Sequence, residues 1–447
     1  MPKPKFVKPL LIGAACTIPV GLVVGLSVNW DHTIFISAVG SGGVKPFIES
    51  FGKKYHQEYG QYDVTVEAGG TTFGITKLAQ GYTNIGNASC NPYPIINKEN
   101  GLRDQWVNKK TFTLGWEGLV LMYSLPQRLS QEAKDAFEIV ITSTNILPLY
   151  AIFSGHYGLK SGGWTDNMNS LWYFATDQAK AQIESLETGV QDKEVLMNTQ
   201  IQPFERAGGN TGSNASIAFT YYSNLTNNYD MSDMTEEQQD AFASGSYGSD
   251  GLTIMQTDDS NSRAWDSFVA ADKGQGGSMV YLTTSFIANE NNRKEMAKHG
   301  YRLAGYLPKN GDTPIFIDGT KQSLEKICSE NGYNWYRPIN TMIDLNLEKA
   351  RDFVYWIYFG THEDMLLTNF TADSFSQYYI DTVYAKGAKP VSYTLFHTMF
   401  RTDLSPIAST TLKEMLLDLN ASDLVLEETR SEPFDTVYGA MDEVTTW

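Results

Sequence analysis

The sequence of 447 residues is poor in cysteine, in histidine and in positive charge. Its three cysteines, Cys16, Cys90 and Cys328, are too few for a disulfide framework, and no two of them have metal-ligand spacing. The formal net charge of −17 excludes a widespread basic face and argues against a nucleic-acid partner. The six histidines are scattered and form no His-Glu-x-x-His motif, so we expect neither a metal, nor a cofactor, nor enzymatic activity.

Long apolar runs are absent except near the N-terminus. Residues 10–28 contain no charged side chain, lysines precede them, and Asp31 is the first charge that follows. As a helix this run is about 28 Å long, close to the thickness of a bilayer core. The positive residues before it place the rest of the chain outside the cytoplasm. We therefore expect residues 1–30 to form an N-terminal transmembrane helix that anchors an extracellular globular part in the cell membrane.

Two other interpretations of this segment stay open. A cleaved signal peptide normally has a shorter apolar region. Lipid attachment at Cys16 fits the small residues that precede the cysteine, although the chain stays apolar beyond it. All three interpretations place the globular part outside the cell.

The chain after the apolar run alternates between strand and helix patterns, with glycine-rich loops between them. Residues 33–40 predict a buried strand, and residues 44–55 predict a helix that has Pro46 in its first turn. Residues 63–70 alternate as a strand does, and residues 75–81 predict a short helix closed by glycine. This order predicts an α/β sheet with crossover connections.

Further strand and helix patterns follow. Residues 111–124 predict long buried strands with glycine breaks, where we expect a hinge between two lobes. A second strand-loop-helix unit spans residues 201–225. The remaining patterns are two strands and an amphipathic helix that ends at a glycine, at residues 276–287, 337–347 and 347–360.

Three loops of similar composition precede predicted helices: Gly-Ser-Gly-Gly, Gly-Gly-Thr-Thr and Gly-Asn-Thr-Gly-Ser. The first turn of a helix has amide groups without internal partners and a partial positive charge. Glycine allows close approach of the backbone, and the hydroxyl groups add donors, so such loops favour a bound oxyanion. Arg206 directly precedes the third loop, and a guanidinium group can bind an oxyanion through two hydrogen bonds. The first loop lacks the third glycine of the dinucleotide pattern, and the second lacks the Gly-Lys-Ser/Thr ending of the nucleoside-triphosphate pattern.

The segments that hold these loops resemble the three signature segments of substrate-binding proteins of phosphate ABC transporters. They read "ISAVGSGGVKPFIESF", "VEAGGTTFGITKLAQG" and "RAGGNTGSNASIAF", in the order in which that family has them. Five later segments of the chain also resemble landmarks of the family: "GWEGLVLMYS", "LPLYAIFSGHYGLKSGGWTD", "GGSMVYLTTSF", "YRPINTMI" and "KARDFVYWIYFG". The resemblance therefore covers most of residues 33–360.

The resemblance implies an α/β, two-lobed periplasmic-binding-protein-like fold with a hinge, here preceded by the transmembrane helix. Lobe I is expected to comprise residues 31–116 and, with a C-terminal extension, residues 338–447. Lobe II is expected at residues 117–337. It includes an insertion at about residues 227–262, which is rich in Asp, Glu, Ser and Gly and therefore solvated.

The resemblance also implies which residues bind the ligand. From the first two loops it implies Ser41, Gly42, Gly43, Val44, Thr71 and Thr72. From the third it implies Arg206, Thr211, Gly212 and Ser213, with Asn210 as a one-residue insertion. Many members have, after the Gly-x-Ser corner, an aspartate that accepts a proton held by phosphate; Ser89 stands there in this chain. Serine can accept a hydrogen bond, so phosphate binding stays feasible, but the rejection of sulfate is less secure.

The implied function is extracytoplasmic capture of inorganic phosphate and its delivery to the permease subunits of an ABC transporter, by an ectodomain that we expect to be monomeric. Capture of another oxyanion, such as sulfate or phosphonate, is the first alternative. An extracellular hydrolase would need a nucleophile with its base, and the sequence shows no such pair. A surface adhesin would leave the three ordered loops unexplained.

Overall fold

The structure is a computed structural model in which the described residues are 33–90, 92, 95–96, 101–154, 168–206, 255–257, 261–308, 311–329, 332–333, 335–360 and 374–391. The expected transmembrane segment, the third loop and most of the acidic insertion lie outside these residues. Within these ranges no helix has both the length and the apolar character needed to cross a bilayer.

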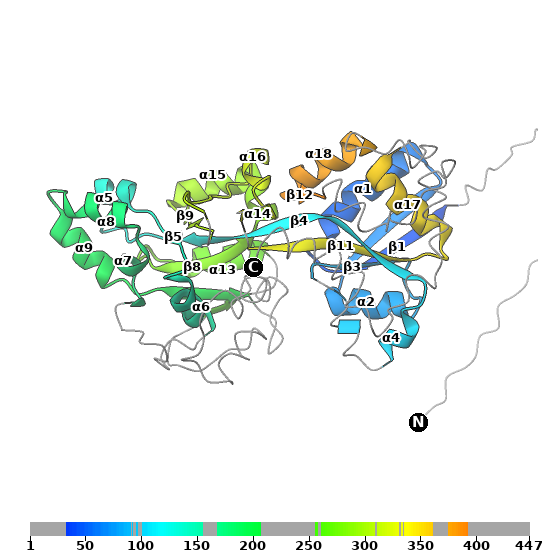
Figure 1. Cartoon of the computed structure of the whole chain (residues 1–447), viewed down its shortest axis with the longest axis horizontal. Coiled ribbons are helices and arrows are strands. Elements are labelled where there is room, and N and C mark those ends of the chain that lie inside the picture. The colour runs from blue at the N-terminus through cyan, green and yellow to red at the C-terminus, as the bar shows by residue number, and fades with distance from the viewer. Residues whose placement is uncertain are drawn as a thin grey trace, which may run out of the picture.

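Two lobes lie side by side, and a long strand runs from one into the other (Figure 1). Lobe I contains the chain's first units and its later helices. Its elements are β1 (Ile34–Gly40), α1 (Lys45–Glu58), β2 (Tyr62–Ala68), α2 (Thr71–Ala79), β3 (Ile85–Ala88), α4 (Leu102–Gln105), β11 (Tyr336–Asp344), α17 (Glu348–Phe359), α18 (Gln377–Ala385) and β12 (Ala388–Pro390).

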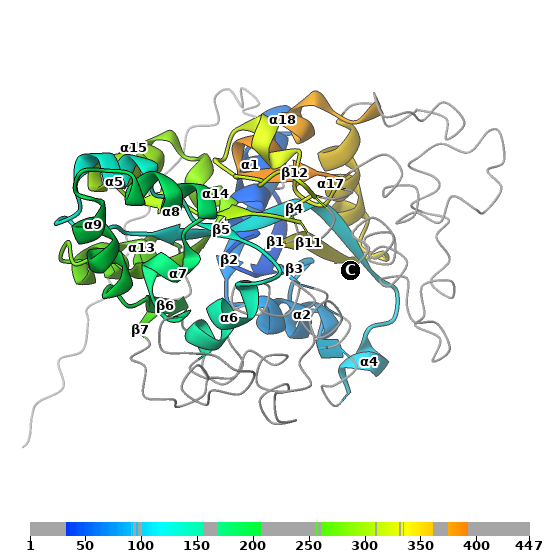
Figure 2. The same cartoon turned by 60° about the vertical axis from the view of Figure 1, so that its left-hand side comes forward.

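Lobe II is built from the chain between β4 (Lys109–Tyr123) and β11. Its elements are α5 (Gln131–Ala136), β5 (Val140–Ile141), α6 (Ile146–Ser154), α7 (Leu171–Phe174), α8 (Asp177–Glu184), α9 (Gly189–Met197), β6 (Gln202–Arg206), β7 (Met255–Thr257), α13 (Asn261–Ala271), β8 (Ser278–Thr283), α14 (Thr284–Ala288), α15 (Glu290–His299), β9 (Arg302–Leu303), β10 (Gly305–Tyr306) and α16 (Lys321–Leu324). In both views α6 and α7 of lobe II lie below the long strand β4 (Figure 1, Figure 2).

One sheet continues through both lobes, in the strand order β2-β1-β3-β11-β4-β8-β6-β7. In lobe I, β1 is parallel to both β2 and β3, and β11 then joins antiparallel to β3. The first part of β4 pairs with β11, whereas its last five residues pair with β8 of lobe II. This mixed α/β architecture with two lobes agrees with the expected fold class.

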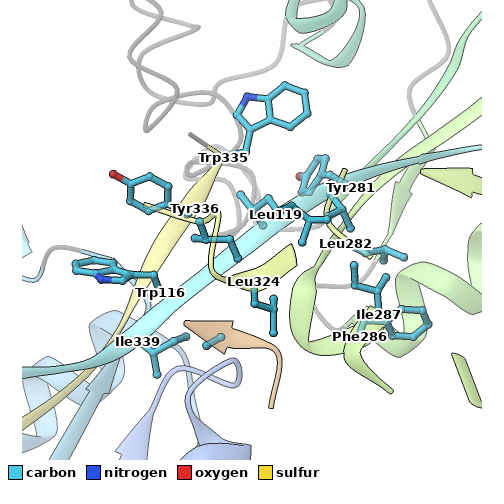
Figure 3. Packing of buried hydrophobic residues seen from close by; sticks show 14 of the residues in the cluster. Trp116, Leu119, Tyr281, Leu282, Phe286, Ile287, Leu324, Trp335, Tyr336 and Ile339 are labelled. Carbon is cyan, nitrogen blue, oxygen red and sulfur yellow. The ribbon is translucent and has the colours of Figure 1, made fainter. Parts of the chain in front are cut away.

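The described core is continuous across the junction of the lobes. Figure 3 shows large side chains from β4, β8, β11 and α14 around the crossing strands, among them Trp116, Leu119, Tyr281, Phe286 and Tyr336. All five are buried. Because interior side chains pack at the density of a solid, this cluster holds β4 and β11 in one register relative to both lobes.

Local sequence signals explain most element boundaries in lobe I. Pro46 lies in the first turn of α1, as expected of a residue that lacks an amide hydrogen. Gly360 ends α17 with a φ of 61°, which a side chain would disfavour. Two expectations differ from the structure. Residues 111–123 belong to one strand, β4, whose register with β11 shifts between Thr113 and Gly115. The strand expected at residues 276–287 spans only Ser278–Thr283, and α14 begins at Thr284.

Candidate anion site

The first two loops and the corner after β3 meet at one edge of the lobe I sheet. Gly40, the last residue of β1, pairs with Ala68 at the end of β2 and with Asn87 near the end of β3. The carboxyl ends of three parallel strands therefore lie side by side, which is where ligands bind in open α/β sheets. Gly40 permits this close pairing, because an added Cβ would lie 2.2 Å from the Asn87 carbonyl oxygen.

Two hydrogen bonds join these three segments through Ser41, Ser89 and Thr71, which together form the hydroxyl cluster. The Ser41 hydroxyl donates to the Ser89 hydroxyl at 2.8 Å. The amide of Ser89 donates to the Thr71 hydroxyl at 3.4 Å. All three side chains are buried, and Ser89 has no exposed surface. The structure thus brings together one predicted residue from each of three segments that are distant in the sequence.

The first loop uses some of its amide groups internally. The amide of Gly43 donates to the Ser41 hydroxyl at 3.3 Å, and the amides of Val44 and Lys45 donate to the Ser41 carbonyl oxygen. Among the described residues, the amide of Gly42 has no acceptor. The loop therefore offers fewer unpaired amides than a helix N-terminus does in general, and its hydroxyl cluster carries more of the polar character of this edge.

The structure says less about the other predicted site residues. Thr72 is exposed and makes no hydrogen bond to the cluster within the described part of the chain. Arg206 is the last residue of β6 in lobe II; only its backbone is described. Asn210, Thr211, Gly212 and Ser213 lie outside the described residues. That these residues bind a ligand stays a prediction.

A buried ion pair lies against the first loop, and neither of its members was among the predicted site residues. Arg337 of β11 and Glu117 of β4 are direct neighbours across the two strands. Nε and Nη2 of Arg337 lie 2.9 Å and 2.8 Å from the same carboxylate oxygen, Oε2 of Glu117. A Cβ added to Gly43 would lie 2.7 Å from Nη2 and 3.7 Å from Oε2, so this loop packs directly on the pair.

Strand register explains why Arg337 reaches the edge of the sheet. β11 is antiparallel to β3, and Asn340 pairs with Ala88, the last residue of β3. Residues before Asn340 therefore extend past the carboxyl end of β3. The Asn340 side chain fixes the corner that follows, because its amide group donates to the Cys90 carbonyl oxygen at 3.0 Å.

The Cys90 thiol, in the corner after β3, is influenced by both the ion pair and the second loop. Burial raises the pKa of the Cys90 thiol to about 12, although the positive charge of Arg337 and a hydrogen bond with Thr71 both lower it. Arg337 is thus close enough to act on a thiol that also contacts the second loop. Cys90 and Cys328 are both free thiols.

The sequence does contain a signal for the ion pair. Glu117 stands between glycines and apolar residues in a predicted buried strand, and Arg337 begins another. Charged side chains are almost never fully buried unless they are paired, so a lone acid in one buried strand and a lone base in another predict each other. Among the described residues, no group of three or more His, Cys, Asp or Glu could hold a metal ion.

No family model matches the chain, but individual proteins and solved structures are similar to it. An uncharacterized lipoprotein of Mycoplasma genitalium is 26% identical over 350 residues, which cover 74% of this chain and 79% of the relative. Among solved structures, a putative phosphate ABC transporter substrate-binding protein from Clostridium perfringens, with bound phosphate, has a TM-score of 0.44 and 13% identity. An ABC-type phosphate transport receptor from Vibrio cholerae has a TM-score of 0.43 and 16% identity. Both cover 80% of this chain, which in turn matches 100% of each.

Proposed function

We propose that this chain captures inorganic phosphate outside the cytoplasm and delivers it to the permease of an ABC transporter. The observation that supports the proposal most directly is the meeting of Ser41, Thr71 and Ser89 at the carboxyl ends of three parallel strands. Each belongs to a segment that resembles part of the phosphate-binding family's signature.

The geometry suits a small oxyanion better than a larger ligand. Short hydroxyl side chains on loops fixed by the sheet can reorient toward a tetrahedral anion without moving the backbone. Gly42 and Gly43 keep the first loop free of side chains, and Gly42 has an amide without an acceptor among the described residues. Binding of phosphate here would exchange hydrogen bonds within the cluster for charge-assisted bonds to the ligand, which are stronger.

Lobe II is proposed to supply the opposing contacts. Arg206 ends β6, and Asn210, Thr211, Gly212 and Ser213 follow it in the chain. In the proposed complex these residues and Thr72 complete the binding of phosphate between the lobes. Closure of the lobes around the ligand would then distinguish the loaded from the empty form for a permease.

The N-terminal segment is proposed to hold the ectodomain, as a monomer, at the outer face of the cell membrane. Residues 10–28 would act as an uncleaved helix, or Cys16 would carry a lipid. The relative from Mycoplasma genitalium is called a lipoprotein, which favours attachment at Cys16 as the second form of anchor. The expected activity is binding and release, without chemical turnover.

Titration calorimetry of the full-length chain in mild detergent tests the proposal. We expect one phosphate to bind per chain, and a panel of sulfate, phosphonate and nucleotide separates phosphate from other anions. Heat with another oxyanion and none with phosphate would mean that this other anion is the ligand. Sulfate is an important member of the panel, because Ser89 carries no charge that would repel it. Absence of binding to every oxyanion would overturn the function.

A further inference from the structure

We propose that Arg337 is itself a ligand-binding residue: the cation through which lobe I holds the anion. This inference rests on the proposed function, and it assigns to the hinge-proximal strand β11 a role that none of the three sequence loops predicts. Four properties of the Arg337–Glu117 pair carry it: the position of the pair, its burial, an unused donor and an unused acceptor.

Arg337 lies beside the segments of the hydroxyl cluster. Its Nη2 atom is 2.7 Å from the position that a Cβ on Gly43 would take, so the guanidinium group packs on the first loop. Its strand, β11, also pairs with β3 and holds the corner after it, because the Asn340 side chain donates to the Cys90 carbonyl oxygen. Ser41 and Ser89, the two hydroxyl groups joined at 2.8 Å, belong to those same two segments.

The burial of the pair strengthens its action on a nearby anion. Arg337 is 5% exposed and Glu117 is 0% exposed. Charges at such a depth are poorly screened, so the attraction of Arg337 for an anion at its free edge and the opposing repulsion from Glu117 both exceed those of surface groups. Since the chain has a net charge of −17, any positive charge at the site has to be local.

The donors of Arg337 are only partly used. Within the described residues, its hydrogen bond and its ion pair both go to one atom, Oε2 of Glu117, from Nε and Nη2. A guanidinium group has five N–H donors, and two of them are on Nη1. An oxyanion at the first loop is a suitable acceptor for this remaining edge of the fork, since guanidinium binds tetrahedral oxyanions through paired donors.

The carboxylate of the pair is also incompletely satisfied. Oε1 of Glu117 is buried and has no hydrogen-bond partner within the described part of the chain. Buried polar atoms are nearly always paired in native proteins, and an exception calls for an explanation such as a functional role or a bound water or ion. A pair that existed only to stabilise the fold would be expected to use both carboxylate oxygens, as a bidentate fork does. Here the guanidinium is turned so that both interacting nitrogens meet one oxygen and the rest of the group faces elsewhere.

A double-mutant cycle separates a binding role from a structural one. The variants are Arg337→Met, Glu117→Gln and the combination of the two, each titrated with inorganic phosphate in calorimetry. If Arg337 only neutralises Glu117, removing both charges restores the wild-type affinity. If Arg337 binds the anion, the double variant stays weak. We expect Arg337→Met to bind roughly 30-fold more weakly, and the double variant at least about tenfold more weakly. Glu117→Gln alone should bind phosphate at least as tightly as the wild type, because no carboxylate then offsets the positive charge of Arg337.

Two further variants keep the test decisive if Arg337→Met folds poorly. Arg337→Lys retains the charge and the ion pair but loses the planar fork, and we expect phosphate binding several-fold weaker with unchanged thermal unfolding. Arg302→Met is the matched control in lobe II. Arg302 donates to the Phe137 carbonyl oxygen and lies near Asp135, so its loss should leave phosphate affinity unchanged.

The outcomes distinguish this inference from the proposed function. Wild-type protein that binds no oxyanion would overturn both. Wild-type protein that binds phosphate, together with a double variant within twofold of it or an unaffected Arg337→Lys, would overturn only the role of Arg337. A loss in Glu117→Gln as large as in Arg337→Met would reduce the pair to a structural unit and also overturn that role.

Discussion

Asp192 of lobe II and Glu117 at the junction of the lobes are both buried carboxylates, but their oxygens are satisfied differently. Asp192 Oδ1 accepts from the Ser130 amide at 2.9 Å, and Oδ2 accepts from the hydroxyls of Ser130 and Thr188 at 2.6 Å each. Glu117 receives Arg337 on Oε2 alone, and Oε1 has no partner in the described residues. A complete network specifies and stabilises a fold, whereas an incomplete one leaves capacity for a ligand.

The complete network ties together the starts of two helices. Ser130 caps α5, because its hydroxyl accepts from the Ala133 amide, and Thr188 directly precedes α9, which contains Asp192. Burial alone would raise the pKa of Asp192, but the hydrogen bonds from Ser130 and Thr188 outweigh it and hold the pKa below its ordinary value. Asp192 is therefore expected to act on stability and not on binding.

The largest expected effect on stability comes from removing the Asp192 carboxylate, and it tests the difference between Asp192 and Glu117. Asp192→Ala leaves three donors without their acceptor in a buried place, so we expect the free energy of unfolding to fall by roughly 3 kcal/mol. Denaturant unfolding followed by circular dichroism measures it. The control is Glu194→Ala, an exposed acid on the same helix, with an expected change within about 0.5 kcal/mol. Phosphate affinity should not change; a weakened affinity would mean that the two carboxylates do not have separate roles.

A smaller loss of stability is expected when a side chain is added to the first loop, where it packs on the Arg337–Glu117 pair. Gly43→Ala would place a methyl group 2.7 Å from Arg337 Nη2, so the guanidinium group or the loop must shift. Overpacking of this kind costs about 1–3 kcal/mol of unfolding free energy. Gly42→Ala is the matched change one residue earlier, where the nearest atom is the Ala68 Cβ at 4.0 Å, and it should be nearly neutral for stability. Thermal unfolding of both variants is the measurement, and equal melting temperatures would mean that the loop does not pack firmly on the ion pair.

The parts of the fold that depend on local sequence could be predicted. For the ion pair, the sequence signals only that Glu117 and Arg337 each need a partner; it does not give their contact or its place beside the first loop. The β1-α1-β2-α2 order follows from apolar periodicity and from glycine at each end, and the loops at Ser41 and Thr71 follow from the same residues. The pairing of Glu117 with Arg337 joins positions 220 residues apart, and it exists only because β11 aligns with β4 in one register. Register of distant strands is set by the whole packed sheet, which local patterns do not encode.

Glycine in the long strand shows the same limit. Gly115 and Gly118 were interpreted as breaks, yet β4 continues through both. A Cβ on Gly115 would lie 2.5 Å from the Lys389 carbonyl oxygen, and one on Gly118 would lie 2.8 Å from a methyl group of Thr284. Both glycines therefore permit close approach of a neighbouring segment and do not interrupt the strand. The identity of that neighbour depends on tertiary structure, so composition alone could not distinguish a break from a contact.

The smallest expected effect is on how the free energy of unfolding depends on pH, which would show that the Asp192 network acts through charge. The pKa of Asp192 is lower in the folded state than in the unfolded state. The ionised carboxylate therefore stabilises the fold above its unfolded pKa, and this contribution is lost as the pH falls through the folded pKa. The gap in unfolding free energy between the wild type and Asp192→Asn should therefore narrow as the pH is lowered from about 6 to about 3. Urea unfolding at a series of pH values measures the gap, with Glu194→Gln as the exposed control. A gap that is constant with pH would mean that the Asp192 hydrogen bonds stabilise the fold whether or not the carboxylate is ionised. Asp192 and Glu117 would then differ in hydrogen-bond geometry and not in the effect of their charge.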